Sequence, residues 1–554
     1  MSSSAPPPSS SAPATPPARR LAGAAVLLSL ATLLSRILGL VREQVFAALL
    51  GAGFFGDAYT MAFRLPNLLR DLFAEGALSA AFQPAFQAAK KQDGIDAARR
   101  LASLILTALL LIVGVITVAG LIFAPDLVGV WASGYAAVPG KAELTVLLTR
   151  IMMPFLLLVS LAALAMGMLN AEERFTPGAL APALFNLATV VTGLGLWLFG
   201  IGRTRGAAIA WAIATVIGGG LQLGVQLVPL WRAGYRPRLA IDLADPRLRA
   251  VLWAMVPATV GLMATQVSIY ISSSFASRED GAVTWLNVAF RLLQLPIGMF
   301  GVAVGTVALQ RAADSASEAD LQQAMSGVRD TLRRGLRLVT FFSLPTAVAF
   351  FVLAEPILGV IYQHGAFTAE DTLAAAAALR YYSLGLLCYA AVKVVAPVFY
   401  ALRRQRIPVL ATFAAVALSV GLSLLLHPTY GYRALALATS LGAVANLAVL
   451  LAVFARNYGG TFPAATLLAL LRMAAAGAVM GVVLSWGSPL LLSDARHAAG
   501  LSTMPAWRAI GGLGLLLLLG GSVYIVLCSL MQVDEVGDVL GGLKRRLRRS
   551  TPSP

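Results

Sequence analysis

The sequence predicts an all-α polytopic membrane protein with about fourteen transmembrane helices. Hydrophobic residues make up 58% of the chain and charged residues only 12%, whereas a soluble domain carries about 25% charged residues. The apolar residues come in long blocks, and each block reaches the ~20 residues that a helix needs to cross a bilayer. Glycine is frequent, at 51 residues, which is typical of closely packed membrane helices.

The apolar blocks define the predicted spans in chain order. Lys and Arg gather in alternate loops between the blocks, which places both termini in the cytoplasm. The net charge of +17 has the same origin, so the sequence argues against a nucleic-acid partner. The approximate spans are 21–49, 57–88, 101–124, 144–170, 177–200, 207–230, 248–275, 281–310, 335–354, 373–402, 408–426, 433–455, 465–486 and 508–532.

A short repeat divides the spans into two halves. Residues 62–65 read Ala-Phe-Arg-Leu, and the same sequence recurs at 289–292. These positions lie in the second and eighth spans, so each half holds six helices and both halves face the same way, as in transporters built from parallel repeats. We expect a disordered cytoplasmic tail, two pseudo-symmetric six-helix lobes, two extra helices and a basic cytoplasmic tail, at 1–20, 21–232, 247–456, 465–532 and 533–554.

Charged residues inside the predicted spans carry the functional information. Arg36 and Arg42 lie in the first span, Arg64 and Arg70 in the second, and Arg291 in the eighth. An Arg at the bilayer centre costs about 2.5–3.5 kcal/mol even on the mildest scale, so these side chains are expected to face a water-filled cavity or one another. Because the Arg fork suits phosphate and carboxylate groups, such a cavity suggests an anionic substrate.

Helical geometry adds polar residues to this set. At 3.6 residues per turn, one face of the second span and the matching face of the eighth span form polar stripes. A purely structural role, with Arg64 paired to Asp57 or to Asp71, stays open. Gly39 lies between Arg36 and Arg42 and would permit a break in the first span. The stripes are Asp57, Arg64, Asn67, Asp71, Glu75, Ser79 and Gln83, and Thr284, Asn287, Arg291 and Gln294.

The sequence gives no sign of catalysis or of a bound cofactor. It contains no phosphate-binding glycine loop, no metal-ligand cluster and no catalytic triad pattern. Cys388 and Cys528 are far apart and lie in apolar blocks, which argues against a disulfide framework or a thiolate metal site. The sequence therefore predicts a transporter rather than an enzyme, with no cofactor and no metal.

Two segments carry a family resemblance. Residues 35–42 read SRILGLVR, and residues 62–77 read AFRLPNLLRDLFAEGA. In these segments the chain resembles the MurJ (MviN) family of the multidrug/oligosaccharidyl-lipid/polysaccharide exporter superfamily. The resemblance implies a lipid II flippase of the bacterial inner membrane. Such a protein moves the undecaprenyl-diphosphate-linked peptidoglycan precursor from the cytoplasmic to the periplasmic leaflet by alternating access, for cell-wall synthesis.

The resemblance also implies roles for single residues. It implies that the last two helices form a groove for the lipid tail and that membrane potential is the suspected driver of transport. It also implies a monomer whose partners are lipid II, the bilayer and the wall-synthesis machinery. Together with the polar stripes, it implies substrate binding by Arg36, Arg42, Arg70, Arg291, Arg64, Asn67 and Gln294, and orienting or gating by Asp57, Glu75, Ser35 and Gly39.

Some positions depart from the family pattern. Asp71, Phe290, Gln310 and Arg404 stand where other residue types are usual. An exporter of another lipid-linked oligosaccharide or of another anionic substrate therefore stays open. A membrane enzyme acting on lipid-linked sugars and a scaffold for wall synthesis are the alternatives from other functional classes.

Overall fold

The computed structural model describes residues 18–70, 78–236, 238–316, 320–459, 463–492, 505–538 and 541. In this part of the chain every regular element is a helix, which confirms the all-α prediction. Eleven helices of the described part are long and apolar enough to cross a membrane. The number of about fourteen spans stays a prediction. The amino-terminal tail up to residue 17 lies outside the described residues, as does most of the carboxyl-terminal tail.

The described part of the first half contains five helices of more than twenty residues and several shorter elements. The helix α3 joins the end of the second predicted span to the third, across a non-helical Gly94 at φ 85° and ψ −179°. Thr204 begins α7 by accepting a hydrogen bond from the backbone of Ala207 at 3.1 Å. The elements are α1 (Ala18–Leu50), α2 (Phe54–Arg70), α3 (Leu78–Ile122), α4 (Ala124–Trp131), the 3₁₀ turn η2 (Ser133–Ala137), α5 (Lys141–Ala171), α6 (Thr176–Leu198) and α7 (Arg205–Arg232).

The second half continues with α8 and ends with α18. Local signals set several helix starts: Asp245 caps α8, and Thr368 and Asp371 form a capping box at α13. Each predicted span coincides with one or more helices. The elements are α8 (Pro246–Ala276), α9 (Ala282–Pro296), η3 (Ile297–Val302), α10 (Ala303–Ala316), α11 (Leu321–Val352), α12 (Ala354–Tyr362), α13 (Ala369–Ala401), α14 (Arg406–Tyr430), α15 (Tyr432–Tyr458), α16 (Ala464–Leu491) and α18 (Ala506–Leu530).

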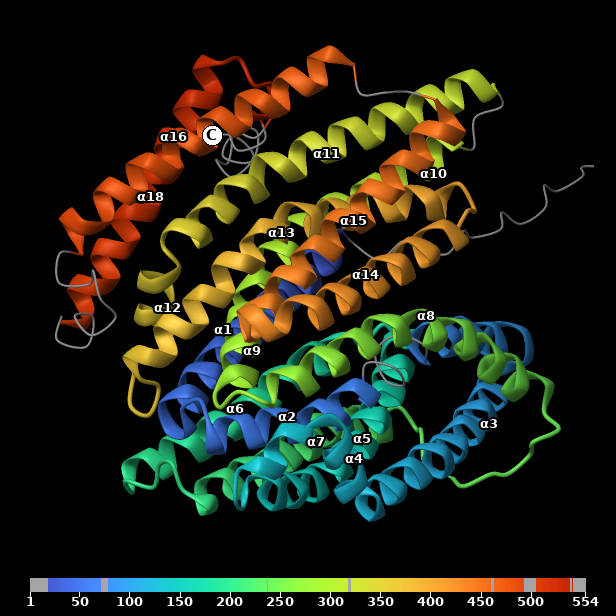
Figure 1. Ribbon diagram of the computed structural model, residues 1–554. Coiled ribbons are helices and arrows are strands. Elements are labelled where there is room, and N and C mark those ends of the chain that lie inside the picture. Colours follow the sequence, from blue (N-terminus) through green and yellow to red (C-terminus); the bar gives the residue numbers. More distant parts are fainter. Residues whose placement is uncertain are drawn as a thin grey trace, which may run out of the picture.

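The helices form two bodies with α8 between them (Figure 1). In one body α5 packs against α2, α3 and α7, and α6 packs against α1 and α7. In the other body α13 packs against α9, α10, α11 and α15, and α14 packs against α15. The helix α8 contacts α3 in the first body and α14 in the second.

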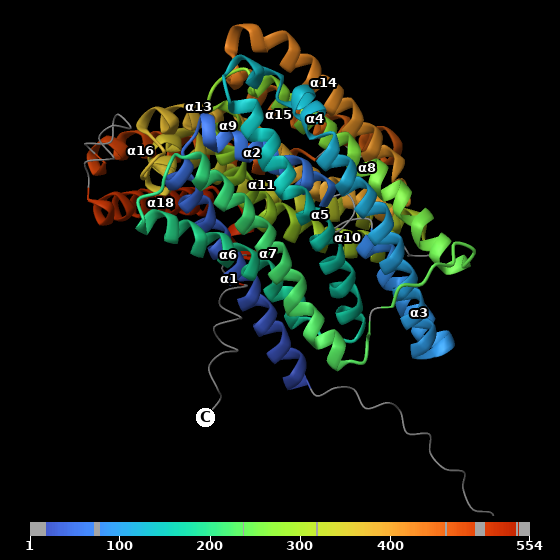
Figure 2. The same cartoon turned by 90° about the horizontal axis from the view of Figure 1, so that it is seen from below.

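The last two helices sit outside both bodies. α16 and α18 pack against each other and against α11, and they lie on the opposite side of the molecule from α3 in both views (Figures 1 and 2). Arg337 of α11 binds the segment after α18, with ion pairs of 2.8 Å to Asp534 and 2.5 Å to Glu535. These ion pairs therefore hold the segment that follows α18 against α11.

The eighth predicted span, 281–310, is not one continuous α-helix. The helix α9 ends at Pro296, and η3 is a π-helical segment that leads into α10. Such segments widen the turn and often lie at functional positions. Beyond it, α10 approaches α13 so closely that a Cβ atom at Gly305 would lie 2.1 Å from the carbonyl oxygen of Lys393. A glycine is required at this contact.

Candidate functional site

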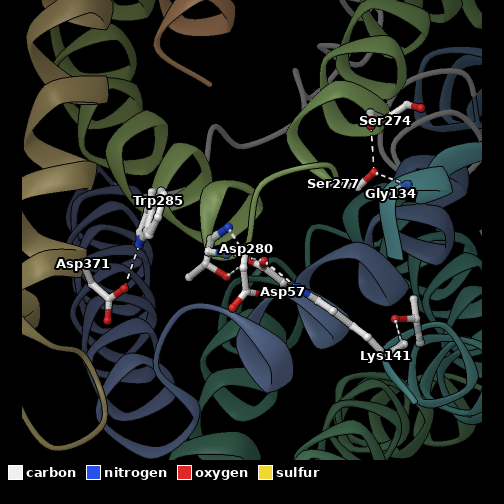
Figure 3. Close-up of polar contacts among 11 residues, drawn as sticks. Asp57, Gly134, Lys141, Ser274, Ser277, Asp280, Trp285 and Asp371 are labelled. Carbon is white, nitrogen blue, oxygen red and sulfur yellow. Dashed lines mark hydrogen bonds and ion pairs between the residues drawn. The ribbon is translucent and has the colours of Figure 1, made fainter. Parts of the chain in front are cut away.

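A carboxylate from α2 caps the amino terminus of α9. Asp57 is fully buried. It accepts hydrogen bonds from the backbone N–H groups of Gly281 at 2.8 Å and Thr284 at 2.9 Å, and from the Thr284 hydroxyl at 2.7 Å. Because the first N–H groups of a helix lack intrahelical partners and carry partial positive charge, an acceptor there holds the helix. Asp57 therefore joins α2 to α9 across the two bodies (Figure 3).

A buried lysine completes this junction. Lys141, at the start of α5, is 1% exposed, and its ammonium pairs with Asp57 at 3.1 Å and with Asp280 at 2.6 Å. It also lies 4.3 Å from the centre of the Tyr135 ring. Two carboxylates and an aromatic face surround one cation, as burial of a charge requires. The sequence suggested Arg64 as the partner of Asp57; the structure gives Lys141 and the α9 terminus instead.

Backbone contacts extend the junction between the bodies. The N–H of Ala366 donates to the carbonyl of Ala48 at 2.8 Å. A Cβ atom at Gly365, whose φ is +58°, would lie 2.4 Å from the same oxygen. The two backbone segments are therefore too close together to leave room for a side chain at Gly365. Within the second body, the indole N–H of Trp285 on α9 donates to the Asp371 side chain at the start of α13 at 2.8 Å (Figure 3). We call the region formed by residues 48–57, 280–285 and 364–371 the closed end.

A cavity of about 360 Å³ lies between the two bodies, deeper than the closed end. From Asp57 to Arg64 and from Thr284 to Arg291 the chain advances seven residues, which is about 10 Å along a helix. The two arginines of the repeat thus lie at matching depths on α2 and α9. The polar side chains of the lining include Arg42, Arg64, Asn67, Arg70, Gln266, Ser268, Ser272, Asn287, Arg291 and Gln294.

A smaller pocket of about 80 Å³ continues this cavity and brings in an acid. Glu43 is nearly buried, forms a close ion pair with Arg42, and lies 3.5 Å from Arg291. The guanidinium of Arg42 also lies 5.3 Å from the Phe185 ring. One carboxylate therefore bridges an arginine of α1 and an arginine of α9, which leaves both guanidinium groups with donors to spare.

Not all of the predicted site residues line this cavity. Arg36 is exposed on α1 and is absent from the lining. Ser35 and Gly39 face α6, where the amide of Asn186 donates to the carbonyl of Ser35 at 3.1 Å and would lie 3.4 Å from a Cβ atom at Gly39. The helix α1 runs through Gly39 without a break. Asp71 and Glu75 lie outside the described residues.

Three charged residues of this region were missed by reasoning from sequence. Glu43 follows Arg42 directly, and an acid inside a predicted span is itself a sign of a functional site. Lys141 and Asp280 lie just outside the apolar blocks, at positions where a charge is ordinary. Their burial at the junction follows from the contact between the bodies, which no local pattern reveals.

The chain was then compared with known proteins. A family profile described as "Lipid II flippase MurJ" matches residues 46–494. The chain belongs to the MurJ family. A relative from Rhizobium tropici named "Probable lipid II flippase MurJ" is 34% identical over 95% of this chain and 96% of its own length. A relative from Burkholderia cenocepacia named "Lipid II flippase MurJ" is 35% identical over 75% of this chain and 80% of its own length.

Solved structures share the fold. "Lipid II flippase MurJ, inward closed conformation" superimposes with a TM-score of 0.74 at 24% identity, over 92% of this chain and 99% of that one. An inward-facing multidrug resistance MATE family transporter of the MOP superfamily has a TM-score of 0.64 at 15% identity, over 78% and 98% of the two chains. The family profile and the curated relatives confirm the family resemblance, and the chain is a multi-pass inner-membrane protein.

Proposed function

We propose that the chain flips lipid II, the undecaprenyl-diphosphate-linked peptidoglycan precursor, from the cytoplasmic to the periplasmic leaflet. The observation that carries this proposal is the match to relatives named lipid II flippases over as much as 95% of the chain. No covalent bond changes in such a reaction. The work is to move a multiply charged headgroup past the bilayer centre while its polyprenyl tail stays in lipid.

The charges of the cavity suit this headgroup. A diphosphate and the carboxylates of a peptide are anions that arginine binds with paired, charge-assisted hydrogen bonds. Arg42, Arg64, Arg70 and Arg291 are among the residues that line the cavity. Glu43 forms ion pairs with both Arg42 and Arg291. An arriving phosphate therefore competes with this one carboxylate for two guanidinium groups. Asn67 and Gln294 supply neutral hydrogen bonds beside them.

Alternating access follows from the position of the closed end. With both termini in the cytoplasm, the end of α1 and the starts of α2 and α9 face the periplasm. The headgroup then enters the cavity from the cytoplasmic side, and release requires Asp57 to leave the α9 terminus. Asp57 is the gating residue in this scheme, while Ser35 and Gly39 position α1 against α6, and Arg36 meets the headgroup before it enters.

The remaining expectations belong to the same proposal. The lobes are residues 21–232 and 247–456, and residues 465–532 form the groove for the lipid tail. The protein acts as a monomer beside the wall-synthesis machinery, and membrane potential favours outward release of the headgroup. A flippase for another lipid-linked oligosaccharide would use the same cavity, and the experiment below separates the two.

The test is complementation in a bacterium depleted of its own lipid II flippase. Wild type is expected to restore growth, whereas Arg42→Ala and Arg291→Ala are expected to fail at equal membrane levels. Arg150→Ala is the matched control, because Arg150 is exposed and, within the described part of the chain, its side chain binds only the carbonyl of Leu121. Failure of correctly inserted wild type would reject lipid II in favour of another lipid-linked or anionic substrate. Growth with both cavity variants would reject the assigned site.

A further inference from the structure

A second cavity lies within the first body, away from the closed end. It has a volume of about 340 Å³ and is enclosed by α3, α5 and α7. Its interior is lined by apolar side chains, and its polar residues gather at one end, where α7 leads into the following loop. We call it the α3–α5–α7 slot. Its apolar lining includes Ala102, Leu106, Leu110, Leu161, Leu164, Ala165, Met168, Leu223, Leu227 and Leu230.

The length of the slot matches one leaflet of a bilayer. From Arg99 at its mouth to Leu110 the chain advances eleven residues, which is about 16 Å along a helix. Half of a hydrocarbon core is about 15 Å. Trp231 and Tyr235 also line the mouth, and such aromatic residues favour the level of the lipid headgroups. The slot therefore reaches from the headgroup region to the middle of the membrane.

The mouth holds one arginine in a fixed position. The guanidinium of Arg99 lies 5.6 Å from the centre of the Tyr235 ring, and the Tyr235 hydroxyl donates to Glu172 at 2.7 Å, which fixes the ring. A Cβ atom at Gly234, whose φ is +80°, would lie 2.9 Å from Nη2 of Arg99. The glycine that ends α7 thus leaves room for the guanidinium group.

The positive charge at this mouth is incompletely neutralised. Arg99 pairs with Asp96 at 3.2 Å through Nη1, but its Nε is buried and has no hydrogen-bond partner in the described structure. Arg236 also lines the mouth and is exposed, and no ion pair links it to the residues that the structure describes. Glu172 beside this mouth is neutralised by Lys90 through an ion pair of 2.6 Å. Arg99 and Arg236 therefore share one further carboxylate, Asp96, beside an apolar slot.

We propose that the α3–α5–α7 slot binds one anionic phospholipid of the surrounding bilayer. One acyl chain fills the space between α3, α5 and α7, and the phosphate accepts hydrogen bonds from Arg99 and Arg236. An anionic headgroup is favoured over a zwitterionic one because a zwitterionic lipid brings its own ammonium group to a mouth that is already positive. The bound lipid stabilises the first body by mass action, and this role does not depend on which molecule the central cavity carries.

The experiment uses the full chain, purified in detergent and stripped of lipid, and native mass spectrometry. Phosphatidylglycerol and phosphatidylethanolamine with identical acyl chains are added in separate titrations. We expect wild type to bind phosphatidylglycerol more tightly, and Arg236→Gln to weaken that binding at least about fivefold. Arg238→Gln is the matched control, because Arg238 is exposed in the same loop but is not part of the lining.

A second pair of variants tests the apolar part of the slot. Leu110→Trp fills the inner end, whereas Leu111→Trp adds the same bulk at a neighbouring position of α3 that is 53% exposed. Only Leu110→Trp is expected to lower binding. Equal binding of the two lipids with no effect of Arg236→Gln would mean adventitious lipid only. Displacement of phosphatidylglycerol by undecaprenyl phosphate would instead assign the slot to a polyprenyl tail. Either result overturns the proposal.

Discussion

Replacing Asp57 by Asn keeps the shape of this side chain and removes the charge that joins α2 to α9. The amide oxygen of the new side chain would still accept the hydrogen bonds from Thr284. Its NH₂ group would face two donors, the N–H of Gly281 and the ammonium of Lys141, because an amide carries two donors in place of one acceptor oxygen. The variant therefore loses the hydrogen bond from Gly281 and the buried ion pair with Lys141.

The size of the effect follows from these contacts. Removing one partner of a buried ion pair costs about 3–5 kcal/mol. The lower end of this range applies here because Lys141 keeps its ion pair with Asp280 at 2.6 Å. The proposed open state exposes Asp57 to water, and on that scheme the loss falls on the closed state alone. A cost of about 3 kcal/mol moves the equilibrium toward opening by roughly 150-fold.

Cysteine cross-linking across the closed end measures this shift. The pair Ala48→Cys and Ala366→Cys joins the two bodies where the backbones touch, in a protein with Cys388 and Cys528 replaced. We expect the rate of cross-linking by a short bifunctional reagent to fall markedly with Asp57→Asn.

The matched control for this assay is Glu355→Gln. Glu355 pairs with Arg380 at 2.7 Å within one body, so its loss leaves the junction between the bodies intact. Unchanged cross-linking in Asp57→Asn, or an equal fall in Glu355→Gln, would refute the assignment of Asp57 to the gate.

Three further predictions concern folding. Gly56→Ala would place a Cβ atom 2.0 Å from a backbone oxygen, so it should destabilise the protein by about 1–3 kcal/mol, measured by thermal unfolding. Gly114→Ala is the control, because Gly114 has open space around it, and it should not destabilise the protein. Burial raises the pKa of Glu172, but hydrogen bonds from Lys90 and Tyr235 outweigh it and hold that pKa below its ordinary value. The stability lost in Glu172→Gln should therefore be seen in thermal unfolding at neutral pH, and should shrink as the pH falls from about 4.5 through the lowered pKa of Glu172. Arg337→Gln should lower the free energy of unfolding by about 2 kcal/mol and speed amide hydrogen exchange in the segment after α18. Unchanged exchange would contradict the role of Arg337 in holding that segment against α11.

The positions of the helices could be predicted from sequence because each membrane-crossing block is long and apolar. The helical period and the repeat can both be read directly from the sequence, and they put Arg64 and Arg291 at matching positions of two polar stripes. Both side chains line one cavity in the structure. The partner of Asp57 could not be predicted in this way: its hydrogen bonds reach Thr284, 227 residues further along the chain. Helical spacing also left the direction of Arg36 open, because positions six apart do not share a face with Arg42.

The π-helical segment η3 changes how force can pass along the eighth span. A continuous α-helix transmits a tilt at one end to the other, whereas a π-bulge is a common place for a helix to bend. Here the π-helical segment separates α9, which Asp57 caps, from α10, which contacts α13 closely at Gly305. In the proposed alternating-access cycle, α9 would then move with the closed end while α10 keeps its contact with α13, and an intermediate closed on both sides would follow. Such an intermediate would keep ions from leaking through while a large headgroup is in transit.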